Sequence, residues 1–312
     1  MRVLVTGSEG FVGSVLLPEL RRHGHDVIGW QSSRHPAGVD VRDPEEVRRR
    51  LAEARPDAVV HLAGITHLPK VLSDPANALA VNVNGTLNVL DAIRREAPKA
   101  RVLLISSAAV YGSPKPDLLP LDEMAPLLAE HPYGVQKIAV ECLGDRFRDD
   151  FGLNVVIARP FNHLGPGQEP RFAASWFAVQ IARVEAGLTS PILRVGNLEP
   201  KRDLLDVRDV VRAYLLLIEP AAPQGVFNIA RGESTRIGWV LDWFLERCTV
   251  PVTVESDQSL FRPMDAPDLR GSNRRLREAT GFIPAIPLAD TLEAILEDAR
   301  VRARAEANKG RS

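Results

Sequence analysis

Three residues near the middle of the chain have the types and the spacing that proton transfer requires. Tyr133 and Lys137 in PYGVQK are four residues apart, so they share one face of a predicted helix. A tyrosine with an ordinary pKa near ~10 is a poor acid or base at neutral pH, but a nearby ammonium stabilises its phenolate. The dipole of the helix acts in the same direction, because Tyr133 follows Pro132 at the expected helix N-terminus. Ser107 in SSAAVYG is placed to donate a hydrogen bond to the same substrate oxygen.

A glycine-rich turn directly follows the first predicted strand. TGSEGFVG places Gly7, Gly10 and Gly13 between this strand and the following helix. Glycines at such a turn let the backbone approach a pyrophosphate while helix N–H groups face it. The turn therefore predicts dinucleotide binding.

The end of the second predicted strand indicates which dinucleotide is bound. An enzyme that uses NAD usually offers an Asp or Glu here to the ribose hydroxyls, but the residues in this chain are GWQSSRH. Ser32, Ser33 and Arg34 can instead hold a 2′-phosphate, with Arg34 forming charge-assisted bonds. The segment favours NADPH, with NAD as the alternative, in which Arg34 is a solvated loop charge.

Other predicted cofactor contacts follow from position along the chain. Asp40 in GVDVRD is a candidate adenine contact, and HLAG would let the cofactor lie across the sheet edge. Together with the turn and the proton-transfer residues, the predicted set is Gly7, Gly10, Phe11, Val12, Gly13, Ser32, Ser33, Arg34, Asp40, Val41, Leu62, Ala63, Gly64, Asn82, Tyr133 and Lys137.

The pattern of elements shows how the chain can position these residues. Short apolar, β-branched runs alternate with segments of helical period through the first half, which predicts a parallel sheet covered on both faces. After NVVIARP the strands become shorter and Pro and Gly clusters appear. The expected fold is α/β, a Rossmann-type doubly wound sheet over residues 1–160. A smaller mixed region over residues 161–312 would bind substrate, with the chain crossing back to the sheet.

Composition excludes several classes of function. The 312 residues include 39 Lys and Arg against 40 Asp and Glu, a net charge of −1 that makes nucleic acid an unexpected partner. Cys142 and Cys248 lie far apart without metal-ligand spacing, so neither a disulfide framework nor a metal site is expected. No apolar run approaches the ~18 residues of a membrane helix, and the N-terminus reads as a strand. We expect a cytoplasmic protein that does not enter a membrane.

These motifs together resemble an extended short-chain dehydrogenase/reductase over nearly the whole chain. ARPFNHLGPGQ, VGNLEPKRDLLDVRDVVRAY and FRPMDAPDLRGSNRRL are similar to the nucleotide-sugar branch that contains GDP-mannose 4,6-dehydratases and GDP-4-keto-6-deoxy-mannose reductases. The resemblance implies that Pro160 and Phe161 border the nicotinamide. It implies contacts to a nucleotide-diphosphate-sugar substrate at Asn162 and Asn197, at Arg202 and Arg262 on the diphosphate, and at Asp265 on the nucleotide ribose.

Some of these substrate contacts also have a physical argument and an alternative. Arginine forks bind phosphate oxygens bidentately, although both arginines could instead form ion pairs that close the small region. Thr66 and His67 follow HLAG and should line the sugar pocket, and Ser107 should also contact substrate. His67 is expected to be a supporting or core histidine more often than a catalytic one.

One position decides between reaction types within this branch. The resemblance implies that the dehydratases need a Glu two residues after the catalytic hydroxyl residue, and here that place holds Ala109. Elimination without a positioned base loses roughly 10²–10⁴ in rate, so a 4-ketoreductase is expected. The alternatives are a nucleotide-sugar 4-epimerase that retains NAD and a catalytically silent nucleotide-binding subunit. The family also implies a homodimer through a four-helix interface, formed here by residues 75–97 and 133–150.

Overall fold

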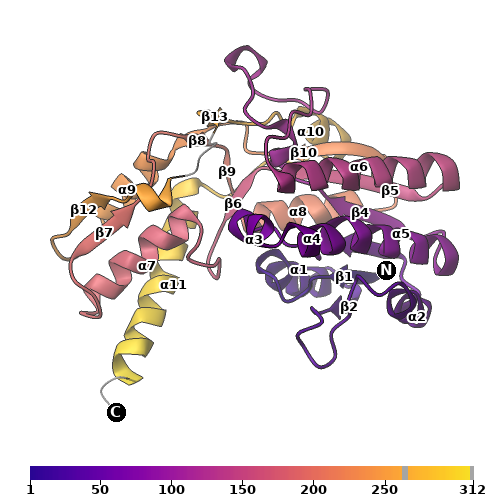
Figure 1. The fold of residues 1–312 in the computed structure, drawn as a ribbon, viewed down its shortest axis with the longest axis horizontal. Helices are drawn as coiled ribbons and strands as arrows, with labels where there is room; N and C mark the ends of the chain where they lie inside the picture. Colours follow the sequence, from indigo (N-terminus) through magenta and orange to yellow (C-terminus); the bar gives the residue numbers. More distant parts are fainter. Residues whose placement is uncertain (262–265, 310–312) are drawn as a thin grey trace.

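The structure is a computed structural model that describes residues 1–261 and 266–309. Within these residues, the central element is a six-stranded sheet in the order β10-β5-β4-β3-β1-β2 (Figure 1). Every neighbouring pair in it is parallel. Its strands are β1 (Arg2–Thr6), β2 (Asp26–Trp30), β3 (Ala58–His61), β4 (Arg101–Ile105), β5 (Asn154–Pro160) and β10 (Gly225–Ile229). The predicted Rossmann-type α/β fold is confirmed.

The strand order predicts a ligand-binding site at the carboxyl ends of β1 and β3. The chain runs from β1 to β2 on one side and then crosses to β3 on the other. In open α/β sheets, ligands bind outside the carboxyl ends of the strands at such a switch point. Thr6 and His61 are paired at these carboxyl ends, so the residues that follow each of them lie at this edge.

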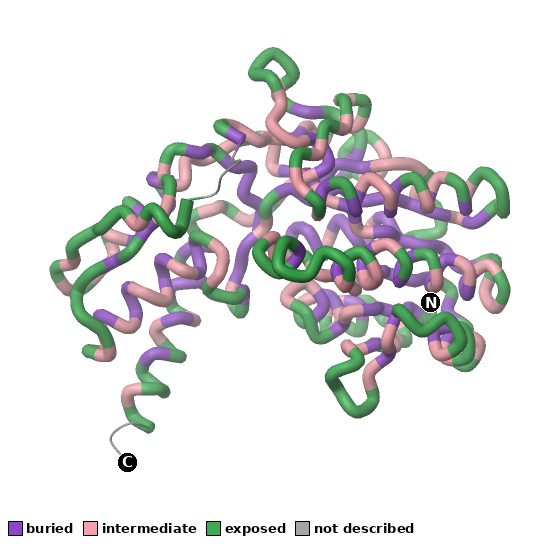
Figure 2. Tube along the Cα trace, in the orientation of Figure 1, coloured by how far each residue is buried: buried purple, intermediate pink, exposed green. Residues whose placement is uncertain are grey.

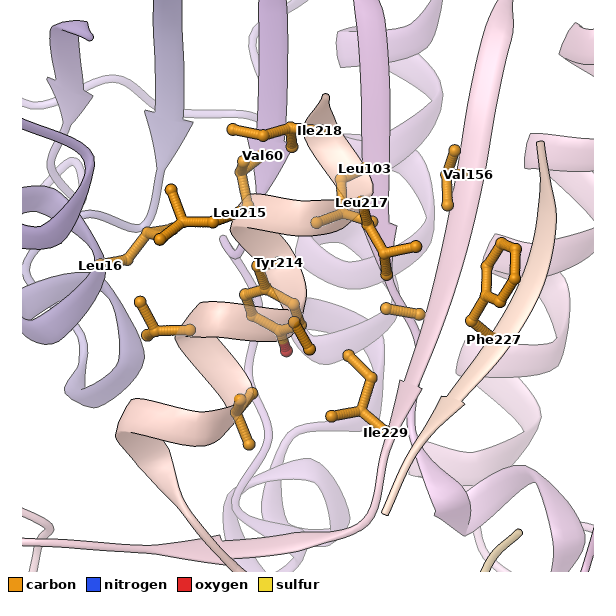
Figure 3. Packing of buried hydrophobic residues seen from close by; sticks show 14 of the residues in the cluster. Leu16, Val60, Leu103, Val156, Tyr214, Leu215, Leu217, Ile218, Phe227 and Ile229 are labelled. Atoms are coloured by element: carbon orange, nitrogen blue, oxygen red, sulfur yellow. The ribbon is translucent and has the colours of Figure 1, made fainter. Parts of the chain in front are cut away.

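Two layers of helices cover the sheet and bury both of its faces. In β1, Val3 and Val5 join one core cluster, whereas Leu4 joins the other. Figure 3 shows the first cluster, in which Tyr214 and Leu217 lie beside the strands. Burial on both faces explains why the strands read as continuous apolar runs. The first layer contains α1 (Phe11–Arg22) and α8 (Val207–Ile218), and the second contains α2 (Pro44–Ala54), α5 (Gly85–Glu96) and α6 (Pro132–Phe151).

A widened helical turn precedes α5. Helices α3 (Leu68–Ser73) and α4 (Pro75–Leu79) follow β3, and a π-helical turn over Ala80–Asn84 then leads into α5. Such turns occur frequently at functional sites, because the extra residue redirects a side chain. Here the turn contains Asn82, which is buried.

The second half of the chain builds a smaller layer beside the sheet, on the left in Figure 1. Helices from three places share one apolar core there with the strand β7 (Ile192–Val195). The helices are α7 (Ala173–Glu185), α9 (Ile237–Leu245) and α11 (Leu288–Lys309). The short strands pair as β6 (Asn162–Leu164) with β9 (Leu204–Asp206), β7 with β12 (Thr253–Ser256), and β8 (Lys201–Arg202) with β11 (Thr235–Arg236) and β13 (Asp268–Leu269).

The chain does not stay in this smaller layer. After β9 it returns to the sheet as α8 and β10, and β10 pairs with β5 to form the edge of the sheet. Helix α10 (Arg274–Thr280) then packs against β10. The sheet therefore takes a strand and a covering helix from the second half of the sequence.

Burial follows this arrangement, with purple segments concentrated in the strands and on the helix faces toward them (Figure 2). Much of α3 and α4 is exposed. Of the helices in residues 1–261 and 266–309, none has the length and apolar character to cross a bilayer.

Candidate active site

The glycine turn packs so closely that two of its glycines admit no side chain. Gly7 has a φ of +67°, and a Cβ on it would lie 2.8 Å from the Ala63 backbone nitrogen. A Cβ on Gly13 would lie 2.5 Å from the Ser8 carbonyl oxygen. Only glycine tolerates such contacts without a backbone shift. The turn therefore lies directly against the carboxyl end of β3.

The other side of the same turn is open. Gly10 is the N-cap residue of α1, and within the described residues a Cβ on it would meet only the Gly7 carbonyl oxygen, at 3.2 Å. Phe11 and Val12 form the half-buried start of the helix. The described residues show no side-chain hydrogen bond that caps this helix N-terminus, so its N–H groups can receive a pyrophosphate and the turn can hold a dinucleotide.

The residues predicted to bind the adenosine end of the cofactor differ in how exposed they are. Ser32 is half-buried in the loop after β2, whereas Ser33 and Arg34 are exposed and accessible to a ligand. The Asp40 carboxylate accepts hydrogen bonds from Arg42, one of them 2.6 Å long, and this lowers its pKa. Val41 is buried against α5.

Sequence reasoning missed a carboxylate at this end of the site. Glu9 belongs to the glycine turn, and its Oε1 atom accepts a hydrogen bond of 3.2 Å from the Ser32 N–H, 23 residues away. The first residues after β2, from Gln31 to Arg34, include no acid, and the glycine turn brings one to this place. The signal was the Glu within TGSEGFVG, but only the fold shows which loop it reaches.

A buried histidine fixes the segment after β3. Thr86 donates its one hydroxyl proton to the Asn82 carbonyl, so it must accept from His61 Nε2–H. His61 Nδ1 therefore accepts from the Thr6 hydroxyl, which in turn accepts from Ala63 N–H. Burial, together with the charge of Lys137, lowers the His61 pKa to about 3, so the ring stays neutral. This chain of hydrogen bonds positions Leu62 and Ala63.

Asn82 positions the next part of that segment. Its amide forms a closed pair with Ile65, accepting from the Ile65 N–H at 2.7 Å and donating to its carbonyl at 2.9 Å. The same amide donates to Gln136 on α6 at 2.7 Å. A Cβ on Gly64 would lie 3.1 Å from the Asn82 oxygen. Asn82 was predicted to contact the cofactor, and in this structure its amide joins the segment after β3 to the helix that carries Tyr133.

Tyr133 and Lys137 lie one turn apart at the start of α6. His131 caps this helix by accepting from the Gly134 N–H at 3.2 Å, and its ring stacks on that of Tyr133 with the centroids 6.2 Å apart. Burial raises the pKa of Tyr133 to about 12, against a hydrogen bond with Ser107 that lowers it. The phenol is therefore protonated at neutral pH, as a proton donor must be.

Lys137 supplies a cation next to this phenol. Its Nζ atom lies 5.8 Å from the centre of the Tyr133 ring and donates to the Ile105 carbonyl at 2.7 Å. Burial lowers the pKa of Lys137 to about 8, and the negative charge of Glu141 opposes that shift. The ammonium is thus charged at neutral pH and can stabilise developing charge on the tyrosine oxygen.

Ser107 begins the short helix that carries Ala109. The helix spans Ala108–Tyr111, and the Ser107 hydroxyl accepts from the Ala109 N–H at 3.2 Å. A Cβ on Gly134 would lie 2.6 Å from the Ala109 carbonyl oxygen, so this helix packs directly on the start of α6. The position that would carry a base for elimination is thus beside the Tyr133 helix, and it holds a methyl group.

A buried ion pair behind the site was not identified from the sequence. Glu141 lies one turn after Lys137 on α6, and Arg159 of β5 donates to both of its oxygens, at 2.9 and 2.6 Å. Ser106 donates a short hydrogen bond to the same carboxylate. The signal in the sequence was a Glu four residues after Lys137, but its buried partner becomes visible only when α6 covers β5.

The residues predicted to contact the sugar and the nicotinamide differ in burial and position. Thr66 and Asn162 are exposed beside the strand ends, and His67 is the N-cap residue of α3. Asn197 is exposed and accepts from the Glu199 N–H at 3.1 Å. Pro160 ends β5 and is buried.

Of the residues predicted to contact the diphosphate and the nucleotide ribose, the structure describes only Arg202. Arg202 is buried in β8, and its Nη1 donates at 2.7 Å to the carbonyls of Lys201 and Ala266. Arg262 and Asp265 lie outside the described residues. Phe161 is also buried, packed beneath Gly271 in the cluster that contains Tyr111.

A glycine turn at the switch point of a parallel sheet, with Ser107, Tyr133 and Lys137 beside it, defines a dinucleotide-dependent enzyme of the short-chain dehydrogenase type. The model of the NAD dependent epimerase/dehydratase family matches residues 3–230. The chain belongs to this family, and the predicted family is confirmed.

Individual relatives match nearly the full chain. GDP-6-deoxy-D-mannose reductase of Pseudomonas aeruginosa is 37% identical over 305 residues, covering 98% of this chain and 99% of that protein. The solved structure of RMD from Pseudomonas aeruginosa complexed with NADPH has a TM-score of 0.88 at 35% identity, covering 97% of this chain and 100% of the other. UDP-glucose 4-epimerase of Thermus thermophilus, in complex with NAD, has a TM-score of 0.84 at 28% identity, covering 96% and 99%.

Proposed function

We propose that the protein is an NADPH-dependent oxidoreductase that reduces the 4-keto group of a GDP-4-keto-6-deoxy-hexose in deoxysugar synthesis. The observation that carries this proposal is the Ser107, Tyr133 and Lys137 arrangement with Ala109 in place of an acid. The similarity to a GDP-6-deoxy-D-mannose reductase, and to a structure that contains NADPH, supports the same substrate and cofactor.

Each side chain has a distinct part in this reduction. The reduced cofactor, when bound, supplies the hydride for the carbonyl carbon. Tyr133 donates its phenolic proton to the carbonyl oxygen, and Ser107 donates a hydrogen bond to the same oxygen as charge develops on it. Lys137 stabilises the phenolate that remains.

We propose that the cofactor is held by three segments. The turn at Gly7, Gly10 and Gly13 would accept the pyrophosphate, and Arg34 would bind a 2′-phosphate. The segment from Leu62 to Gly64 would line the sheet edge. Among the predicted substrate contacts, Thr66 and Asn162 are best supported, because both are exposed beside the strand ends.

A nucleotide-sugar 4-epimerase that retains NAD is the second candidate. The similarity to a UDP-glucose 4-epimerase in complex with NAD favours it, as does the Glu9 carboxylate beside Ser32. The two activities differ in cofactor use: a reductase consumes one reduced cofactor per turnover, and an epimerase consumes none.

We expect the purified protein to oxidise NADPH in a 1:1 ratio with added GDP-4-keto-6-deoxy-mannose, because each carbonyl reduced takes up one hydride. Absorbance at the nicotinamide band would be followed together with product formation by mass spectrometry. GDP-mannose is the control and should give no 4-keto product, since Ala109 offers no base. Interconversion of GDP- or UDP-hexoses at C4 without added cofactor would instead establish the epimerase.

We further propose that the protein works in the cytoplasm as a homodimer through α4, α5 and α6. Leu79, Leu87 and Val135 on these helices are 48%, 41% and 55% exposed. Apolar side chains gathered on adjacent helices are typical of a protein interface. Sedimentation equilibrium should give about twice the chain mass of 34.2 kDa, and Leu87→Asp with Val135→Asp should give the single chain. A wild-type protein at the single-chain mass at micromolar concentration would contradict this.

A further inference from the structure

The cofactor's ribose would meet two opposite charges from two different elements. Arg34 comes from the loop after β2, where dinucleotide-binding proteins usually discriminate the two cofactors. Glu9 comes from the glycine turn and reaches this loop through its 3.2 Å hydrogen bond to Ser32. Both residues are exposed, so a ligand bound at this edge of the sheet can contact either.

Glu9 is held at this place as an anion. Hydrogen bonding with Ser32 lowers its pKa, and the positive charge of Arg34 lowers it further, against the opposing effect of burial. The carboxylate is therefore ionised at neutral pH. It also occupies the Ser32 N–H, a donor that a phosphate oxygen would otherwise use.

We propose that Glu9 is a specificity-determining residue that narrows the preference for NADPH over NADH by opposing Arg34. This inference rests on the proposed cofactor. A 2′-phosphate would face the Glu9 charge and compete for the Ser32 N–H, both of which weaken NADPH binding. A 2′-hydroxyl would donate a hydrogen bond to the same carboxylate, which favours NADH.

The proposal predicts the effect of Glu9→Gln on binding. The amide keeps an oxygen acceptor for the Ser32 N–H and removes only the charge. The ratio of the Kd for NADH to the Kd for NADPH should rise roughly tenfold, the size expected for one like-charge contact near a protein surface. Glu9→Ala should raise the ratio further, because it also frees the Ser32 N–H. Arg34→Ala should lower it.

The experiment measures binding to the full chain by titration of nicotinamide fluorescence, with no sugar present. Glu19→Gln on α1, the helix that follows the glycine turn, is the matched control, because Glu19 bonds to Arg22 at the far end of this helix. Its ratio should stay within about twofold of the wild type, since charges beyond a Debye length are screened. High salt should reduce the effect of Glu9→Gln.

The outcomes separate this inference from the proposed function. An unchanged Kd ratio in Glu9→Gln overturns the role of Glu9, whatever sugar the enzyme reduces. A wild-type protein that binds neither cofactor overturns both proposals. Failure to reduce the keto-sugar, with the Kd ratio shifted as expected, overturns the substrate alone.

Discussion

Tyr133→Phe should lower kcat for keto-sugar reduction at least about 100-fold while the Kd for NADPH stays within about twofold. The change deletes a proton donor whose usual contribution is roughly 10²–10⁴ in rate, and it removes little volume. It also removes the hydrogen bond with Ser107. Single-turnover kinetics, with cofactor binding measured separately, would test this.

Tyr214→Phe is the matched control for that experiment. Tyr214 is a fully buried tyrosine that packs in the core between α8 and the sheet (Figure 3). Removal of the Tyr214 hydroxyl should leave kcat within about threefold of the wild-type value, because a residue inside this core donates no proton to substrate. Retention of more than a tenth of kcat in Tyr133→Phe would refute the general-acid role.

Arg159→Met should lower the free energy of unfolding by about 3–5 kcal/mol, because it leaves the Glu141 carboxylate buried without its counter-ion. The two side chains are each only 5% exposed, so little water can replace the lost contact. Urea denaturation at pH 7, followed by circular dichroism, measures the change.

Two further variants test whether the effect of Arg159→Met comes from the buried ion pair. Arg146→Met breaks an exposed ion pair with Asp149 and should cost no more than about 1 kcal/mol. The double variant Arg159→Met with Glu141→Met should recover stability relative to Arg159→Met alone, because it also removes the buried carboxylate that the single variant leaves without Arg159. A double variant less stable than the single one would mean that these residues act through packing rather than through charge.

The parts of the fold that depend on local pattern could be predicted from the sequence. Strands buried on both faces are apolar throughout, so RVLVTG followed by a glycine turn and by alternating strand and helix patterns predicts the first unit of this fold. Tyr133 and Lys137 could be placed together because helical spacing alone puts residues four apart on one face.

The contacts between distant segments could not be predicted in this way. The hydrogen bond between Ser32 and Glu9 exists because β1 and β2 are neighbours with their carboxyl ends level, which places two loops side by side. In the sequence, Arg159 is a polar residue in a predicted strand, and its partner Glu141 is identified only because α6 packs on β5 in the fold. The sequence places Asn82 in a helix near the cofactor, but it does not show that Asn82 lies in a π-helical turn or that its amide bonds to Ile65.

The late position of β10 in the sequence has a consequence for synthesis on the ribosome. Chains emerge N-terminus first, at about 5–20 residues per second, and domains fold as units when they are complete. When residues 1–160 have emerged, β5 still has an unpaired edge, and the face that α8 will cover is bare. Unpaired strand edges and exposed apolar surface promote association with other chains. The nascent chain therefore exposes an unpaired sheet edge, and remains prone to aggregation, until β10 has been synthesised as far as Ile229.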